Sequence, residues 1–219
     1  MVILTKLQLA LDDIALGDAL CLLRDVRKFI DIVEVGTPFL MEYGAEAIRT
    51  IRKEYPELDV LCDGKIMDAG TYEAEIAFKA GAKYVTVLSV TDDATIKSVA
   101  ETADKYGGYS VADMICVGDQ AERVRRLKEL GIHIIAVHTG VDQQKLGRTP
   151  LDDLRTIKKC SGDTPVSVAG GISEETLHKY LEYNPEIVIV GGGILHSSFP
   201  AASAEQIANQ IREHNRRIK

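Results

Sequence analysis

Short apolar runs alternate with amphipathic segments along the whole 219-residue chain. The short apolar runs predict buried strands, and the segments with a 3.6-residue period predict helices. Strands are predicted at 7–12, 31–36, 60–65, 84–89, 109–115, 133–139, 165–170 and 187–192. Helices are predicted at 18–29, 42–55, 71–80, 93–106, 119–130, 151–159, 174–183 and 204–217.

This order is a βα unit repeated eight times without a linker, which predicts a single (β/α)8 TIM barrel over residues 1–219. A doubly wound sheet is the alternative, weakened by the lack of Gly-x-Gly-x-x-Gly after the first strand. Gly81 and Gly131 are predicted to end helices in the left-handed conformation. Thr149 is predicted to cap a helix that starts at Pro150, and Ser173 to cap the helix at 174–183.

Charged residues stand late in five of the predicted strands, at the end where a TIM barrel carries its active site. Alternation along a strand places each of them on the same face as apolar residues of that strand. Burying a charge without a partner is costly, so a purely structural role for all of them is disfavoured. The residues are Asp12, Glu34, Asp63, Lys65, Asp113 and His138.

The carboxylates of this group outnumber its cations, because only Lys65 and a neutral or charged His138 oppose them. Crowded carboxylates raise one another's pKa unless a positive charge offsets them. An oxygen-rich site of this kind suits Mg²⁺ better than zinc, and no Cys/His set has zinc spacing.

Glycine pairs stand at the ends of the last two predicted strands, at Gly170-Gly171 and Gly191-Gly192. Glycine lets backbone N–H groups approach an anion closely, and a following helix adds its positive end. The loops after strands seven and eight are the usual phosphate site of a TIM barrel, so a phosphate is expected here. Tight turns alone are the structural alternative.

The overall charge and composition argue against some classes of binding partner. A formal net charge of −7 argues against nucleic acid and anionic membranes. No apolar run has the length of a membrane span or a signal peptide. The four cysteines form no C-x-x-C pair, so we expect reduced thiols and a cytoplasmic location.

Several motifs together resemble a known family. Asp-x-Lys-x-x-Asp at Asp63, Lys65 and Asp68 is the signature of the orotidine-monophosphate decarboxylase suprafamily. Within it, the chain resembles the 3-hexulose-6-phosphate synthase family over almost its whole length, from Leu7 to about Ile211. The motifs that carry this resemblance lie at residues 7–12, 33–38, 65–70, 111–115, 137–140 and 168–172.

The resemblance implies a lyase of formaldehyde fixation in the ribulose monophosphate pathway. The reaction joins formaldehyde to D-ribulose 5-phosphate and gives D-arabino-3-hexulose 6-phosphate through a 1,2-enediolate. Glu34 and Asp63 would bind the Mg²⁺ that stabilises this enediolate, and Lys65 would hydrogen-bond to it. His138 is the favoured general base, and Asp113 would orient the sugar or help to move protons.

The same resemblance assigns the remaining residues. Asp12 would bind a substrate hydroxyl and hold Lys65. Backbone N–H groups of Gly171, Gly191 and Gly192 would bind the phosphate. Asp68 would reach into the site of a neighbouring subunit, which implies a homodimer. On the residues alone, an aspartate at this point could instead cap the following helix.

Two other functions stay open at this point. The decarboxylase of 3-keto-L-gulonate 6-phosphate is related, but it typically has Glu where Asp113 stands and Arg where Thr139 stands. A barrel that binds a sugar phosphate without catalysis is the second, disfavoured by the intact set of charged residues. One departure from the family is Gly64, which is expected to point away from the barrel axis at a small cost in stability.

Overall fold

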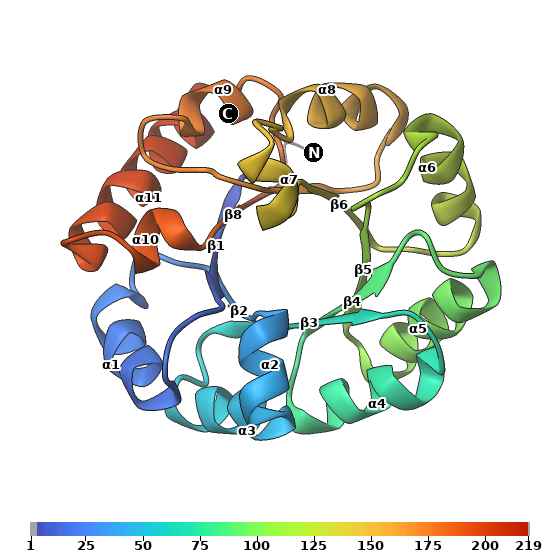
Figure 1. The fold of residues 1–219 in the computed structure, drawn as a ribbon, viewed down its shortest axis with the longest axis horizontal. Coiled ribbons are helices and arrows are strands. Elements are labelled where there is room, and N and C mark those ends of the chain that lie inside the picture. Colours follow the sequence, from blue (N-terminus) through green and yellow to red (C-terminus); the bar gives the residue numbers. More distant parts are fainter. Residues whose placement is uncertain (1–3, 219) are drawn as a thin grey trace.

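Eight parallel strands close into a barrel in chain order, and helices surround it (Figure 1). The computed structural model describes residues 4–218. The strands are β1 Lys6–Leu11, β2 Ile32–Val35, β3 Asp59–Ile66, β4 Tyr84–Leu88, β5 Tyr109–Asp113, β6 Ile134–His138, β7 Val166–Ala169 and β8 Ile187–Val190. Each of them lies where the sequence predicted a strand, so the predicted TIM barrel is confirmed.

The helices fill the connections between the strands. They are α1 Leu16–Val26, α2 Thr37–Tyr43, α3 Ala45–Glu54, α4 Gly70–Ala80, α5 Asp93–Tyr106, α6 Gln120–Glu129, α7 Val141–Lys145, α8 Leu151–Cys160, α9 Leu177–Leu181, α10 Gly192–Leu195 and α11 Pro200–Arg217. The short helices α2, α7 and α10 were not predicted. The segment 42–55 was predicted as one helix but is broken at Gly44, whose φ of +59° lies outside the helical region.

The predicted helix ends are partly confirmed. Gly81 and Gly131 adopt positive φ values of +108° and +82° after α4 and α6, as glycine permits. The prediction for α8 was wrong, because Pro150 is the capping residue and no side chain of residues 4–218 caps the helix. The prediction for α9 was also wrong, because Ser173 opens a turn closed by a bond from Thr176 N to its carbonyl, and the helix starts later.

Two apolar cores pack against the strands, one outside the barrel and one inside it. The outer core packs the outward-facing strand residues against the helices, and the inner core fills the barrel itself. The inner core consists of Ile32, Leu61, Tyr84, Val111, Ile134, Ala136 and Ile187, with Ile189 packed against it. Inward-facing positions closer to the carboxyl ends of the same strands hold polar side chains, among them Glu34, Asp63 and Asp113. The inner core therefore fills the barrel below a polar opening at the carboxyl ends of the strands, which we call the barrel mouth.

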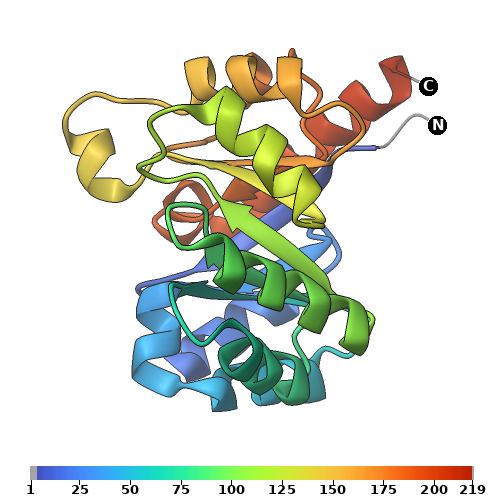
Figure 2. The same ribbon diagram turned by 90° about the vertical axis from the view of Figure 1, so that its right-hand side faces the viewer.

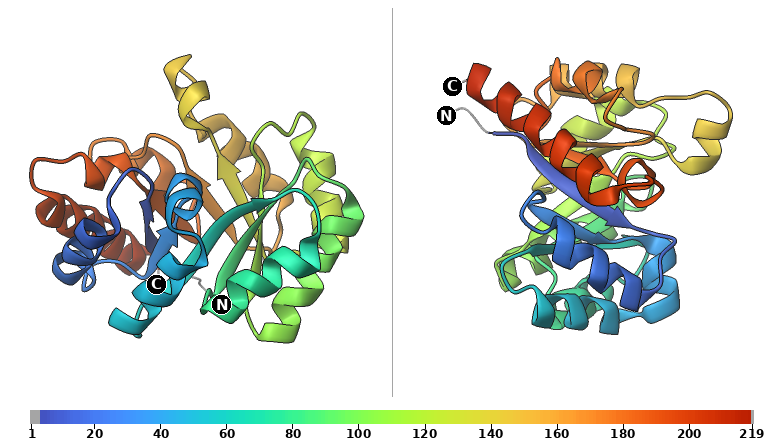
Figure 3. Two further views of the ribbon diagram at one scale, coloured as in Figure 1. Left: turned by 60° about the horizontal axis from the view of Figure 1, so that its bottom comes forward. Right: turned by 90° about the vertical axis from the view of Figure 1, so that its left-hand side faces the viewer.

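The two ends of the barrel differ. Both described chain ends lie at one end, and α7 projects beyond the rim at the other, where the strands finish (Figures 2 and 3). The loops that follow the strands therefore gather at the α7 end. Within residues 4–218, no helix is long and apolar enough to cross a membrane.

Candidate active site

Asp63 is the most densely hydrogen-bonded side chain at the barrel mouth. Its Oδ1 accepts from the Thr86 hydroxyl at 2.8 Å, and its Oδ2 accepts from the Thr37 hydroxyl at 2.8 Å. Lys65 Nζ also donates to Oδ2. Burial alone would raise the pKa of Asp63, but the Lys65 ammonium and the two hydroxyl donors outweigh burial and hold that pKa below its usual value. Asp63 is therefore a fixed anion.

A local irregularity in β3 sets the direction of the Lys65 side chain. Cys62 pairs with Val85 and Ile66 with Val87, so three residues of β3 face the single residue Thr86 of β4. Lys65 adopts a φ of +42°, uncommon for a residue with a side chain, and its N–H donates to the Thr86 hydroxyl at 2.9 Å. Asp63 and Lys65 do share the mouth as predicted, but a bulge rather than simple alternation brings them together.

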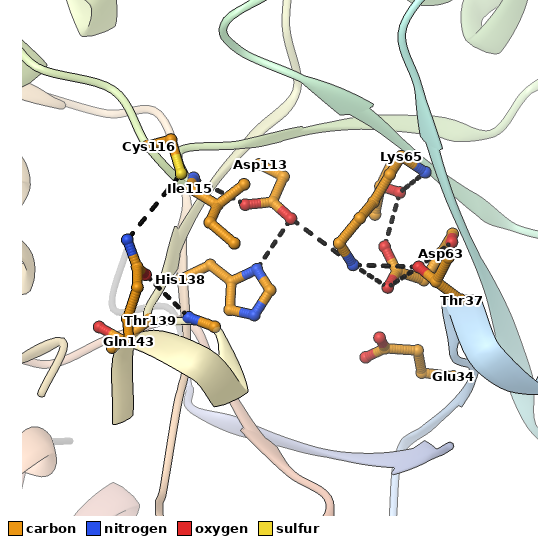
Figure 4. Close-up of polar contacts among 12 residues, drawn as sticks. Glu34, Thr37, Asp63, Lys65, Asp113, Ile115, Cys116, His138, Thr139 and Gln143 are labelled. Atoms are coloured by element: carbon orange, nitrogen blue, oxygen red, sulfur yellow. Dashed lines mark hydrogen bonds and ion pairs between the residues drawn. The ribbon is translucent and has the colours of Figure 1, made fainter. Parts of the chain in front are cut away.

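Asp113 lies between Lys65 and His138 (Figure 4). Its Oδ2 is 2.9 Å from His138 Nδ1 and 3.8 Å from Lys65 Nζ, and its Oδ1 accepts from Ile115 N at 2.9 Å. The four side chains from Asp63 to His138 thus form a row of alternating acidic and basic groups. Burial would lower the pKa of Lys65, but the neighbouring Asp63 and Asp113 raise it, so Lys65 stays an ammonium.

Glu34 is buried at the end of β2 with few partners. The only hydrogen bond to its carboxylate within residues 4–218 comes from Gln8 Nε2, at 2.5 Å. Burial and the nearby Asp63 charge raise the pKa of Glu34 to about 8. The buried Oε1 of Gln8 itself has no donor among the described residues. This corner of the mouth is therefore short of positive partners.

The expected Mg²⁺ fits this corner. Two carboxylates, Glu34 and Asp63, face a region where a cation would relieve the electrostatic cost of ionising Glu34. Asp63 Oδ1 accepts one hydrogen bond and so keeps a lone pair for a metal. No group of three or more His, Cys, Asp or Glu within residues 4–218 is arranged to hold a metal. Two protein ligands completed by water and substrate is a usual arrangement for Mg²⁺.

Asp12 lies beside this group at the end of β1, half-buried. Burial and the charge of Asp63 raise its pKa. A side chain on Gly36 would overlap Asp12 Oδ1, so that glycine makes room for the carboxylate. In the described chain the ion pairs of Lys65 are with Asp63 and Asp113, and the expectation that Asp12 holds Lys65 stays a prediction.

The predicted phosphate glycines lie together at the ends of β7 and β8. Gly171 has a φ of +65°, and Gly191 caps the short helix α10, which begins at Gly192. In the described part of the chain, no hydrogen bond from the N–H groups of these three glycines is recorded. These N–H groups are therefore free to bind an anion.

Asp68 stands apart from the other predicted residues. It is exposed, and among the described residues its Oδ1 accepts a hydrogen bond only from the adjacent Ala69 N, at 2.7 Å. It does not cap α4, because Ala69 is the capping residue and no side chain caps that helix. Of the two roles considered for this aspartate, the helix cap is therefore wrong.

Sequence reasoning missed three residues that organise the site. Thr37 accepts from Lys65 Nζ at 3.1 Å and donates to Asp63, Thr86 binds both Asp63 and the Lys65 backbone, and Gln8 donates to Glu34. Single hydroxyl and amide side chains are common throughout the chain and carry no charge, so they gave no signal. Gln8 could have been found as a polar residue between the apolar residues Leu7 and Leu9 of a strand.

Comparisons with known proteins show which family the chain resembles. The 3-hexulose-6-phosphate synthase of Bacillus subtilis (strain 168) is 42% identical over 206 residues, covering 94% of this chain and 98% of that protein. The crystal structure of 3-hexulose-6-phosphate synthase from Salmonella typhimurium has a TM-score of 0.94 and 48% identity, covering 95% of this chain and 99% of that one.

A more distant neighbour is 3-keto-L-gulonate-6-phosphate decarboxylase from Vibrio cholerae, with a TM-score of 0.83 and 26% identity over 98% of this chain and 99% of that one. The resemblance found in the motifs is thus confirmed over nearly the whole chain. The model of the orotidine 5'-phosphate decarboxylase / HUMPS family matches residues 5–207, and this chain belongs to that family.

Proposed function

We propose that the protein is a 3-hexulose-6-phosphate synthase, which condenses formaldehyde with D-ribulose 5-phosphate to give D-arabino-3-hexulose 6-phosphate. The observation that carries the proposal is the row Asp63, Lys65, Asp113 and His138 beside the buried Glu34. The synthases that the chain resembles, at 42% and 48% identity, support the same reaction.

The reaction begins with removal of a proton from C1 of the ketose, next to its carbonyl. His138 is the proposed base, because Asp113 occupies Nδ1 and leaves Nε2 for the substrate. The electron pair of the broken C–H bond moves onto the carbonyl oxygen and gives the enediolate. C1 then bonds to the carbon of formaldehyde, whose oxygen takes a proton back from the imidazolium.

Negative charge develops on the C2 oxygen of the substrate, next to the C1 hydroxyl. Lys65, fixed between Asp63 and Asp113, is placed to donate a hydrogen bond to that charge. A Mg²⁺ held by Glu34 and Asp63 would supply Lewis-acid stabilisation of the same developing charge. Thr37 and Thr86 keep Asp63 from rotating away.

The rest of the substrate is proposed to lie across the mouth. Asp12 would accept a hydrogen bond from a sugar hydroxyl. The free N–H groups of Gly171, Gly191 and Gly192 would bind the phosphate on the opposite side.

The functional unit is proposed to be a homodimer with shared sites, in which Asp68 completes the site of the partner. The Asp68 side chain is exposed and does not cap α4, so it is free to reach across an interface. Met67 and Tyr72, on either side of it in sequence, are large apolar residues exposed at 53% and 71%. Exposed apolar surface of this kind supports an interface at this point.

The decarboxylase of 3-keto-L-gulonate 6-phosphate is the less favoured reaction. The decarboxylase neighbour is 26% identical, against 48% for the synthase from Salmonella typhimurium. Asp113 and Thr139 are also the choices typical of the synthases. A binding barrel without catalysis is disfavoured because the acid–base row is complete.

Turnover tests the proposal. Purified protein with Mg²⁺ should consume formaldehyde only when ribulose 5-phosphate is present, and EDTA should stop the reaction until Mg²⁺ is restored. Formaldehyde loss that is independent of ribulose 5-phosphate, or none at all with Mg²⁺ present, would refute it.

A further inference from the structure

A cavity of about 300 Å³ lies between the segment after β6 and helix α9, against Gly170 and Gly171. Arg148, Thr149, Thr176, Lys179 and Tyr180 contribute side chains to its wall. No acidic residue is among the described residues that line it. This is unusual in a chain with 33 acidic and 26 basic residues.

The two cations of this cavity have no partner in the described part of the chain. Within residues 4–218, no carboxylate lies within 4.0 Å of the Arg148 or Lys179 side chain, and neither side chain makes a hydrogen bond. Another cavity, of about 580 Å³, differs in this respect, because Asp93, Asp119 and Glu122 line it together with Arg123 and Arg126. There Arg123 and Arg126 each bind Asp93 at 2.6 Å, and Arg126 also binds Glu129 at 2.7 Å, so both arginines already have carboxylate partners.

Other hydrogen-bond donors face the same space. Gly171 lines the cavity and has a free N–H, as described above. The Tyr180 hydroxyl makes no recorded hydrogen bond within the described chain, although the residue is only 4% exposed. The cavity therefore offers cations and neutral donors to a ligand and no carboxylate that would repel an anion.

The glycines proposed to bind the phosphate supply only dipoles. A phosphate monoester carries a charge of about −1.5 to −2 at neutral pH. Its recognition is usually completed by Arg or Lys, and the Asp12, Glu34, Asp63 and Asp113 carboxylates at the mouth would otherwise repel it. Arg148 and Lys179 are the free cations that share a cavity with Gly171.

We propose that Arg148 and Lys179 bind the phosphate of the sugar-phosphate substrate, supplying the positive charge that the glycine backbone lacks. This inference rests on the proposed function. It assigns a binding role to the segment between α7 and α8, which bears Arg148, and to the first turn of α9, which bears Lys179.

The test compares Arg148→Gln and Lys179→Gln with the control Lys145→Gln. Lys145 lies on α7, close in sequence to Arg148, but pairs with Asp142 at 3.0 Å and does not line the cavity. All three positions are exposed, so the variants should fold, which circular dichroism can verify. Each changes the net charge by one unit, so general electrostatic effects are matched.

Each cavity variant should raise the KM for ribulose 5-phosphate about tenfold, as loss of one hydrogen bond to a charged group predicts. The dissociation constant of inorganic phosphate, measured by calorimetry, should rise by a similar factor. The kcat at saturating substrate should change much less, because neither residue contacts the reacting carbons. Arg148→Glu should be worse than Arg148→Gln, whereas Lys145→Gln should match the wild type.

Unchanged KM and phosphate affinity in both cavity variants of an active enzyme would overturn the inference and leave the proposed function standing. Equal losses in Lys145→Gln would also overturn it, since the effect would then be general. Weakened inorganic phosphate binding in the two cavity variants alone would support the site even if the protein failed to use formaldehyde. Phosphate binding and turnover thus test the two proposals separately.

Discussion

Asp113 Oδ2 lies 2.9 Å from His138 Nδ1. The carboxylate therefore holds Nδ1 toward Asp113 and leaves Nε2 to face the barrel mouth. A carboxylate acceptor keeps the proton on Nδ1 and leaves Nε2 unprotonated in the neutral ring. The same Oδ2 lies 3.8 Å from Lys65 Nζ. One buried carboxylate therefore orients both the proposed base and the proposed hydrogen-bond donor.

His138→Ala should slow exchange of the C1 proton of ribulose 5-phosphate with D₂O, even without formaldehyde. Loss of a general base typically costs about 10²–10⁴-fold. Proton NMR measures the exchange, and the affinity for ribulose 5-phosphate should change far less. As a companion, Asp113→Asn keeps the shape but favours the other tautomer, so exchange should fall there too. Undiminished exchange in His138→Ala would assign the base elsewhere.

Glu34 should make the metal-free protein less stable as the pH rises. Its pKa is raised from 4.5 to about 8 by burial and by Asp63, so the folded state holds a proton that the unfolded state has lost. The contribution of Glu34 to the free energy of unfolding is therefore present at low pH and is lost as the pH rises through about 8. The slope from this one group is at most about 1.4 kcal/mol per pH unit. Denaturation by urea between pH 5.5 and 8.5 measures it.

Glu34→Gln is the matched control for that titration, since it removes the carboxyl and keeps its size. The variant should lose this part of the pH dependence of the free energy of unfolding. In the wild type, Mg²⁺ should stabilise the folded state more at pH 8.5 than at pH 6. An identical slope in the variant would contradict the assignment.

Lys65→Ala and Asp68→Ala should each be nearly inactive alone, yet recover activity when refolded together. If Asp68 acts in the partner, a mixed dimer has one site with both defects and one intact site. Random pairing gives mixed dimers in about half of the total, so roughly a quarter of wild-type activity should return. Mass spectrometry of the native dimers verifies mixing. No recovery in verified mixed dimers would exclude the shared site.

Gly64→Ala should stabilise the protein by about 0.4–1 kcal/mol without loss of activity. The backbone at Gly64 is outside the left-handed region. Among the described residues, an added Cβ would meet only the side chains of Ile66 and Cys62, at 3.6 and 3.9 Å. Gly36→Ala is the contrasting variant, because its Cβ would overlap Asp12 Oδ1 and lie 2.6 Å from Leu11 O. Thermal melting should move upward for the first and downward for the second. A lower melting temperature for Gly64→Ala would show strain at that position.

The strands were predictable because most of them are short apolar runs that are largely buried, and these runs form the barrel. The charged residues late in those runs were equally visible, since an isolated charge such as Glu34 or Asp113 is conspicuous among apolar neighbours. The helix at 42–55 was predicted without its break, because one glycine, Gly44, decides it through a φ value that the periodicity does not encode.

Other features depend on contacts between distant segments. Thr86 is an ordinary strand residue in the sequence, and it becomes important only because the β3 bulge brings Asp63 and the Lys65 backbone to its hydroxyl. The left-handed conformation of Lys65 is likewise stabilised by these tertiary contacts against local preference. Single-sequence patterns do not contain such pairings.

The most direct test of the proposed synthase activity is to follow ¹³C-labelled formaldehyde with ribulose 5-phosphate and Mg²⁺ by NMR. The proposed chemistry forms one new bond, between C1 of the ketose and the formaldehyde carbon. The label should therefore appear in the hydroxymethyl group at C1 of a 3-hexulose 6-phosphate, with one ribulose 5-phosphate lost per formaldehyde. Formaldehyde left untouched, while the same preparation releases CO₂ from 3-keto-L-gulonate 6-phosphate, would contradict it.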